Sequence, residues 1–272
     1  MLESIKPNVW RLREDGRDVV IKAYEELALY LKVRQLHKQL IQLDYADALD
    51  AEFDDENQLI IQPYYARLQE TNYANPQVRK QVIRVLTTLH DTEEQESWWN
   101  QTTLPASSLY MKWQMRLSRI LAVQDKLEEF IDAPSVRYSI EQAQLALDEF
   151  IHYDAHHTLI HGDIAHHNFI LGARGIRIID FDLASYADPD EEWILLLQRF
   201  LPFADYDLQL LVDEHPDFLR VLEEQPAGLR YPNELFREWL AFLQKPHPKK
   251  QERLLAFSAK AIENHRKLWY DD

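Results

Sequence analysis

The spacing of apolar residues changes near Tyr65, and this change limits the fold more than any other feature of the chain. Before it, residues Val9–Tyr24 hold two β-rich runs around an Asp-Gly pair, a pattern that predicts a hairpin. Leu27–Leu43 follows with apolar residues at helical spacing. Ala48–Tyr65 then holds two more β-rich runs around the turn sequence DDEN. The first sixty-odd residues are therefore predicted to form a small antiparallel sheet with one inserted helix.

Beyond Tyr65 the pattern is mostly that of amphipathic helices. The segments with helical spacing are Pro76–His90, Leu109–Phe130, Ile140–His152 and most of Glu191–Trp269. Strands followed by a run of helices indicate an α+β fold. We expect an N-terminal lobe at residues 1–65 and a larger, mainly helical lobe at residues 66–272.

Composition excludes several kinds of partner. The 272 residues carry a net charge of −16 with a pI near 5.1, which argues against nucleic acid or an anionic membrane surface as partner. An acidic surface suits a cationic ligand, although solubility alone explains the acidity as well. There is no cysteine, and no run of about 18 apolar residues occurs. We expect a cytoplasmic protein; the sequence leaves its oligomeric state open.

One short hairpin interrupts the helical half. Phe169–Leu171 and Ile176–Ile179 are short apolar runs joined by Gly-Ala-Arg-Gly. Pairing across that turn puts Asn168 opposite Ile179 or Asp180, with Asp163 just before it in the chain. Carboxylate and amide oxygens are the ligands that a hard cation such as Mg²⁺ prefers. The hairpin therefore predicts a Mg²⁺ site at its open end.

A zinc site built from imidazoles is the alternative, because five histidines lie within residues 156–168. The pairs His152/His156 and His157/His161 have the i,i+4 spacing that clamps zinc on a helix. However, residues 158–160 have the character of a strand, and the sequence HExxH is absent. Hydrogen bonding within a polar loop is the ordinary role of such histidines, and the pattern favours that interpretation.

The order of these residues resembles a known family. His161-Gly162-Asp163, then Asn168 after four residues, then Ile179-Asp180-Phe181-Asp182 are similar to the signature of the aminoglycoside phosphotransferase and choline kinase superfamily. That superfamily is related to protein kinases, whose catalytic loop has the same Asp-to-Asn spacing. The resemblance implies a protein-kinase-like fold and an ATP- and Mg²⁺-dependent kinase that acts on a hydroxyl of a small molecule.

The resemblance also implies roles for residues of the hairpin and its flanks. Asp163 would orient the acceptor hydroxyl and receive its proton. Asn168 and Asp180 would hold Mg²⁺ against the phosphate oxygens of ATP or another nucleoside triphosphate. His161 would support this site. Asp182 would support the metal or cap a turn, and both alternatives stay open.

In the N-terminal lobe, Lys22 fits the lysine that contacts the α- and β-phosphates. Gln62-Pro63-Tyr64 fits the nucleotide-binding hinge between lobes, so Gln62 and Tyr64 are predicted to contact the nucleotide. Val85–His90 is similar to the helix ending in Leu-His that is common in this superfamily. Leu109–Trp113 resembles the Firmicute branch that includes spore-coat-associated members.

Three departures from the family pattern concern the nucleotide. Glu3–Asn8 contains no glycine where the family covers the phosphates with a glycine-rich loop, which leaves the first strand of this lobe in question. The helix after Lys22 carries Gln35, His37 and Gln39 where a glutamate should pair with the lysine. Glu192 stands where the family has aspartate. We expect these losses to weaken nucleotide binding and to spare the catalytic hairpin.

Two functions therefore remain: a small-molecule kinase, or a kinase-like binding or structural protein without turnover, for example one associated with the spore coat. The complete set of Asp163, Asn168 and Asp180 favours the kinase. The sequence does not identify the acceptor. Trp193, Trp239 and Trp269 could form an aromatic cage for a cationic acceptor, or they could simply belong to the core of amphipathic helices.

Overall fold

The structure is a computed structural model, and it describes residues 1–94, 98, 103–151 and 157–270. The strands are β1 (Leu2–Lys6), β2 (Val9–Glu14), β3 (Arg17–Ala23), β4 (Glu52–Asp54), β5 (Leu59–Pro63), β6 (Thr158–Ile160), β7 (Phe169–Gly172), β8 (Gly175–Ile178) and β9 (Ser185–Ala187). The helices are α1 (Leu27–Gln42), α2 (Pro76–His90), α3 (Leu109–Leu121), α4 (Gln124–Glu128), α5 (Ala133–Asp148), α6 (Pro189–Phe200), α7 (Leu208–Glu214), α8 (Asp217–Glu224), α9 (Ala227–Arg230), α10 (Asn233–Gln244) and α11 (Pro248–Tyr270).

The chain forms two compact units. The first comprises Met1–Ser107 with His156–Glu192, and the second comprises Ser108–Ala155 with Trp193–Asp272. The first unit holds all the strands, and the second holds only helices among its described residues. The predicted lobe boundary at residue 65 stays a prediction.

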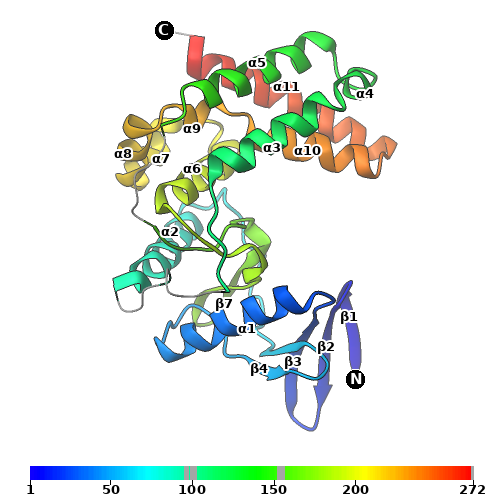
Figure 1. The fold of residues 1–272 in the computed structure, drawn as a ribbon, viewed down its shortest axis with the longest axis vertical. Helices are drawn as coiled ribbons and strands as arrows, with labels where there is room; N and C mark the ends of the chain where they lie inside the picture. The colour runs from blue at the N-terminus through cyan, green and yellow to red at the C-terminus, as the bar shows by residue number, and fades with distance from the viewer. Residues whose placement is uncertain (95–97, 99–102, 152–156, 271–272) are drawn as a thin grey trace. The chain divides into compact units, whose positions relative to one another are not determined.

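The first unit begins with a five-stranded antiparallel sheet in the order β1-β2-β3-β5-β4 (blue and light blue in Figure 1). Both hairpins and the single inserted helix α1 are as predicted. The first strand is present: Leu2–Lys6 pairs with β2 at the edge of the sheet, and all five of its residues are exposed. The turn between β2 and β3 has Asp15 at φ 48° and Gly16 at φ 78°, the left-handed pair that an Asp-Gly hairpin requires.

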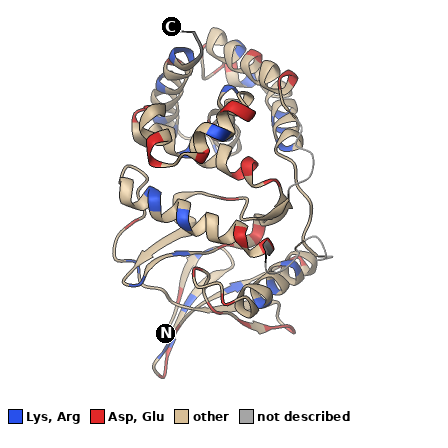
Figure 2. Cartoon of the chain, turned by 90° about the vertical axis from the view of Figure 1, so that its left-hand side faces the viewer, with Lys and Arg blue, Asp and Glu red and all other residues tan. Residues whose placement is uncertain are grey.

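Charged residues of both signs lie on this sheet (Figure 2), and several pair across it. Arg11 Nε donates to Asp18 Oδ1 at 2.7 Å, and the same guanidinium makes a second bond to that carboxylate. Arg17 on β3 pairs with Glu52 on β4. Opposite charges across strands stabilise each pair by a fraction of a kcal/mol to about 1 kcal/mol, so these pairs support the register of the sheet.

Two helices pack on the strands of this unit. The buried face of α1 carries Tyr30, Val33, Leu36 and Leu40 at helical spacing. Helix α2 begins and ends at the predicted residues. Its start is fixed by Asn75, which caps the N-terminus by accepting a hydrogen bond from Gln77 N at 2.9 Å, and by a proline in the first turn.

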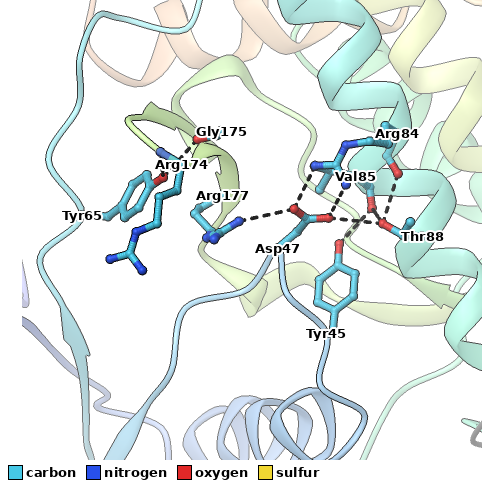
Figure 3. A network of polar contacts seen from close by, with 9 residues as sticks. All are labelled: Tyr45, Asp47, Tyr65, Arg84, Val85, Thr88, Arg174, Gly175 and Arg177. Carbon is cyan, nitrogen blue, oxygen red and sulfur yellow. Dashed lines mark hydrogen bonds and ion pairs between the residues drawn. The ribbon is translucent and has the colours of Figure 1, made fainter.

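The connection between α1 and β4 is tied to α2 and β8 through Asp47 (Figure 3). The Asp47 carboxylate, almost completely buried, accepts two bonds of 2.9 Å from Arg84 of α2 and lies 3.5 Å from Arg177 of β8. Its backbone carbonyl accepts from Ile178 N at 2.9 Å, while Tyr45 OH donates to Val85 O at 2.8 Å. A bidentate pair fixes orientation as well as distance, so this connection holds α1 to the hairpin that carries the predicted site.

The segment after β5 is fixed to the same hairpin. Tyr65 OH donates to Gly175 O at 3.1 Å and accepts from Arg174 N at 3.2 Å (Figure 3). A Cβ on Gly172 would lie 2.1 Å from the Tyr65 ring, so the ring can occupy this position only because residue 172 is glycine. The chain after β5 therefore lies against β7 and β8.

The second unit is helical (green to red in Figure 1), with α3 packed on α5 and α10, and α10 on α11. Its core includes a stacked pair, Trp113 and Tyr231, with ring centroids 4.3 Å apart. Trp239 is fully buried and donates to Ser258 Oγ, and Trp193 is buried between His215 and Phe218. Trp193 and Trp239 are core residues of this unit, which agrees with the interpretation that they belong to the core of amphipathic helices.

Two of the predicted helices have different limits. The predicted helix at 109–130 is interrupted after Leu121, and the one predicted from Ile140 begins already at Ala133, where Asp132 caps it by accepting from Ser135 N.

None of the helices in the described part of the chain combines the length and the apolar character that crossing a bilayer requires.

Candidate active site

The hairpin β7–β8 carries the predicted site, with the expected register. Leu171 pairs with Ile176 and Phe169 with Ile178, and Ile179 N donates to Asn168 O at 2.9 Å. Asn168 therefore lies opposite Ile179, one of the two predicted pairings. The following residue, Asp180, is at the open end of the same hairpin.

The loop before β7 is held by its own polar groups. Asn168, buried, donates from Nδ2 to the Asp163 carbonyl at 2.9 Å, which leaves Oδ1 as the end of its side chain that can serve as a metal ligand. Gly162 has φ 78°, and a Cβ there would lie 2.3 Å from Leu183 O, so this position requires glycine. In the sequence His161-Gly162-Asp163, the glycine is therefore required both by its backbone conformation and by its close packing. Asp163 is half-buried and lies next to Asn168.

His161 is a structural member of this loop. It is fully buried, its Nε2 is 3.0 Å from Ile179 O, and Asp163 N donates to its Nδ1 at 3.3 Å. The ring therefore carries its proton on Nε2 and joins the Asp163 end of the loop to the strand that leads into Asp180.

Asp180 lies where two lysines meet it. Its backbone is left-handed, with φ 68°, which turns the side chain out of the line of the strand. Lys22 Nζ lies 2.7 Å from Oδ1, and Lys6 Nζ lies 3.1 Å from Oδ2. Burial raises the pKa of Asp180, but the two ammonium groups outweigh burial and bring this pKa to about 2. The carboxylate is therefore ionised at neutral pH and attracts cations.

Asp182 supplies the carboxylate partner for Lys22 that the helix lacks. Lys22 Nζ lies 2.6 Å from Asp182 Oδ2, and Tyr24 OH donates to Asp182 Oδ1 at 3.1 Å. Lys32 of α1 donates to the backbone carbonyl of the same residue. Lys22 therefore has a carboxylate partner although α1 lacks the expected glutamate.

His37 occupies the face of α1 where a glutamate was expected. The ring is buried edge-on against Phe181, with centroids 5.4 Å apart. Burial, with a smaller contribution from the nearby Lys22 charge, lowers the pKa of His37 to about 4. His37 is therefore neutral at pH 7. Helix α1 thus places an uncharged ring against Phe181, the residue that follows Asp180.

Glu192 contacts the HGD loop, residues His161-Gly162-Asp163. Its carboxylate is fully buried and accepts from Gly162 N at 2.7 Å, from His161 N at 3.3 Å and from His90 Nε2 at 2.9 Å. Burial raises the pKa of Glu192, but the His90 bond and the remaining donors hold it below its usual range. The expectation that the change from aspartate to Glu192 weakens nucleotide binding stays a prediction; the contacts of Glu192 show that a side chain at this position holds the backbone of the HGD loop in place.

A cleft of about 460 Å³ opens beside the hairpin within the first unit. Gln62, Tyr64 and Asn168 line it, and its apolar walls are Val9, Val20, Leu49, Ile170 and Ile179. Such a volume, mainly apolar with a few polar groups, is typical of a small-molecule or nucleotide site. One face of the Tyr64 ring is covered by the Arg11 guanidinium, 3.2 Å from the ring centroid. Lys22 and Asp180 are not among the residues that line the cleft, but Lys6, which lines it, lies 3.1 Å from Asp180.

The histidines have other partners than a shared metal. His157 stacks on Tyr186 with centroids 5.4 Å apart, and His161 is bonded as described. Among the described residues there is no group of three or more histidine and carboxylate side chains placed to hold a metal ion. His152 and His156, which formed the other i,i+4 pair, lie outside the described residues.

Sequence reasoning missed Lys6 and Tyr24 as site residues. Tyr24 follows Lys22 by two positions on an extended segment, so it projects to the same face as Lys22, and this spacing was a usable signal. Lys6 gave no such signal, because its proximity to Asp180 depends on the pairing of β1 with β2 and on contacts 174 positions apart.

The sequence and the fold of this chain are similar to those of known proteins. The family profile described as "Phosphotransferase enzyme family" matches residues 5–223. The fold is similar to that of an aminoglycoside phosphotransferase from Alicyclobacillus acidocaldarius, with TM-score 0.68 and 15% identity over 98% of this chain and 89% of that one. It is also similar to choline kinase LicA from Streptococcus pneumoniae, with TM-score 0.53 and 10% identity over 97% and 93% of the two chains.

A third similar structure is spectinomycin phosphotransferase in complex with ADP and spectinomycin, with TM-score 0.57 and 15% identity over 96% of this chain and 85% of that one. A comparison with curated proteins gave no match. The likeness to solved structures establishes a protein-kinase-like fold, and the family profile covers well over half of the chain. This chain belongs to the phosphotransferase enzyme family.

Proposed function

We propose that the protein transfers the γ-phosphate of ATP, or of another nucleoside triphosphate, to a hydroxyl of a small molecule, with Mg²⁺ as cofactor. The observation that carries this proposal is the open end of the β7–β8 hairpin. There the Asn168 side chain donates a hydrogen bond to the Asp163 carbonyl. Ile179 pairs with Asn168 across the hairpin, and the next residue, Asp180, forms an ion pair with Lys22. Family membership and the cleft lined by Gln62 and Tyr64 support it.

The residues at this hairpin fit a Mg²⁺ ion. Mg²⁺ takes oxygen ligands, usually one or two from protein carboxylates with the rest from water and phosphate. Asp180 provides an ionised carboxylate that already meets two cationic groups, and Asn168 provides an amide oxygen. The ion would supply charge neutralisation on the phosphate oxygens.

The chain's own residues account for the remaining chemistry. Asp163 would accept a hydrogen bond from the acceptor hydroxyl, orient its oxygen toward the γ-phosphorus, and take the proton as the new P–O bond forms and the bond to ADP breaks. Lys22, held by Asp182 at 2.6 Å, would contact the phosphates with its position already fixed. Gln62 and Tyr64 would contact the base at the end of β5.

We infer that the acceptor is a small molecule that carries a positive charge. The net charge of −16 suits a cationic molecule. Two of the similar structures are a choline kinase and a spectinomycin phosphotransferase bound to spectinomycin, and both choline and spectinomycin are cations at neutral pH. We therefore propose amino alcohols and aminoglycosides as the first acceptors to test.

The alternative is a kinase-like protein that binds but does not turn over. The absence of glycine from Glu3–Asn8 favours it, because fewer flexible backbone N–H groups face the phosphates. The second argument for it was the missing helix glutamate, and that argument is weakened by the Lys22–Asp182 pair. The kinase is therefore the better supported of the two.

Phosphorus NMR tests the proposal. ATP and Mg²⁺ are incubated with the protein and a panel of amino alcohols, aminoglycosides and thiamine, after thermal-shift measurements show which members stabilise the protein. We expect at least one stabilising compound to yield ADP and a new phosphomonoester signal. If compounds stabilise the protein together with nucleotide and none is phosphorylated, the non-catalytic alternative is correct.

A further inference from the structure

The turn between β1 and β2 differs chemically from a glycine-rich phosphate loop. Lys6 pairs with Val9, so Pro7 and Asn8 form a two-residue turn. Asn8 adopts the left-handed conformation, with φ 61°, and Pro7 has no N–H to donate. The backbone of this turn therefore offers few donors to an anion.

The same turn is fixed in place by two contacts. Ala23 N donates to Asn8 O at 2.9 Å, and Asn8 Nδ2 donates to Glu25 Oε1 at 2.9 Å. Both contacts lie just beyond Lys22, at the end of β3. The turn thus keeps a set position relative to Lys22, whereas a glycine-rich loop adapts its shape to the ligand.

The Lys6 side chain reaches from this turn into the site. Its Nζ lies 3.1 Å from Asp180 Oδ2, and the residue lines the same cleft as Gln62 and Tyr64. The side chain is 53% exposed, so packing does not confine it, and a four-carbon stem lets the ammonium change partner. When Asp180 holds a divalent cation, its carboxylate no longer needs the Lys6 charge, and Lys6 is left beside the bound nucleotide.

We propose that Lys6 binds the phosphates of the nucleotide and replaces, with one side-chain cation, the backbone N–H groups of a glycine-rich loop. This inference rests on the proposed function, because it assumes that the cleft takes a nucleotide. In the structure Lys6 pairs with Asp180; with nucleotide bound it pairs with phosphate oxygens instead. The charge of the phosphates is then met by Lys6 and Lys22 together with the metal.

Calorimetry with Lys6→Met tests this role, because methionine keeps the length of the stem and removes the charge. With Mg²⁺ present we expect ATP and ADP to bind about fivefold more weakly to the variant, the size of one partly exposed charged contact. Adenosine, which has no phosphate, should bind equally to both proteins. Lys6→Arg should restore ATP binding to within about twofold, since it restores the charge.

Lys80→Met is the matched control, because Lys80 is an exposed lysine of α2 outside the cleft, and this variant should bind ATP like the wild type. If the wild type binds ATP and Lys6→Met binds it equally well, Lys6 forms only a surface ion pair with Asp180. The inference about Lys6 then fails, while the proposed function is unaffected. Tighter binding to Lys6→Met would mean that Lys6 merely blocks Asp180. If the wild type binds no nucleotide, the proposed function fails and the inference with it.

Discussion

Replacing Asp163 by asparagine is expected to reduce phosphoryl transfer by about a hundredfold or more, the usual contribution of a positioned general base. The amide keeps the shape of the carboxylate but cannot accept the proton of the acceptor hydroxyl. Asn168 Nδ2 bonds to the backbone carbonyl of Asp163, which the substitution does not alter. The loop should therefore keep its conformation, and nucleotide binding should change little.

The measurement is the initial rate of phosphomonoester formation, with ATP affinity determined in parallel by calorimetry. Asp148→Asn is a suitable control, because it makes the same chemical change at the exposed C-terminal end of α5, within the second unit. Equal rates for Asp163→Asn and the wild type would exclude Asp163 as the base. A parallel loss of ATP affinity would point instead to a disturbed loop.

Replacing Glu192 by alanine is expected to lower the free energy of unfolding by roughly 3–5 kcal/mol, the cost of removing one partner from a buried, charge-assisted cluster. The substitution removes the acceptor of three donors, the part-buried Gly162 N and the buried His161 N and His90 Nε2. It also releases the backbone of the HGD loop, so activity should fall together with stability. Denaturant unfolding followed by tryptophan fluorescence measures the change.

Glu192→Gln separates charge from shape, since the amide oxygen can still accept from Gly162 N. We expect it to cost less than alanine. The pKa of Glu192 is held below its usual range in the folded protein, so its contribution is present at neutral pH and above its unfolded pKa. That contribution is lost as pH falls through the lowered folded pKa. The difference in stability between wild type and Glu192→Ala should therefore shrink in acid; a constant difference would contradict the charge-based account.

Features set by local chemistry could be predicted from the sequence. The Asp15-Gly16 turn and the β7–β8 hairpin each depend on a few neighbouring residues with distinct conformational preferences. The limits of α2 followed from the helical spacing of its apolar residues, and the register of the β7–β8 hairpin followed from its turn. The family signature then indicated which hairpin carries the chemistry.

Features set by distant contacts could not be predicted. Strand β1 has five exposed residues and no alternation of apolar and polar positions, so only its pairing with β2 reveals it. The Lys22–Asp182 pair joins residues 160 positions apart, and no spacing rule connects them. The contacts of Glu192 could not be predicted for the same reason, because its partners His90 and Gly162 come from other parts of the chain. The likeness to the spore-coat-associated branch stays a prediction.

Titration of ATP by calorimetry, with Mg²⁺ and with a chelator, tests most directly whether this hairpin couples a nucleotide to Mg²⁺. We predict clearly tighter binding with Mg²⁺ in the wild type. Asp180→Ala should abolish this Mg²⁺ dependence, while Lys22→Ala should weaken binding under both conditions, because one residue acts through the ion and the other on the phosphates. Absence of binding under both conditions, for folded wild-type protein at millimolar ATP, would contradict the account.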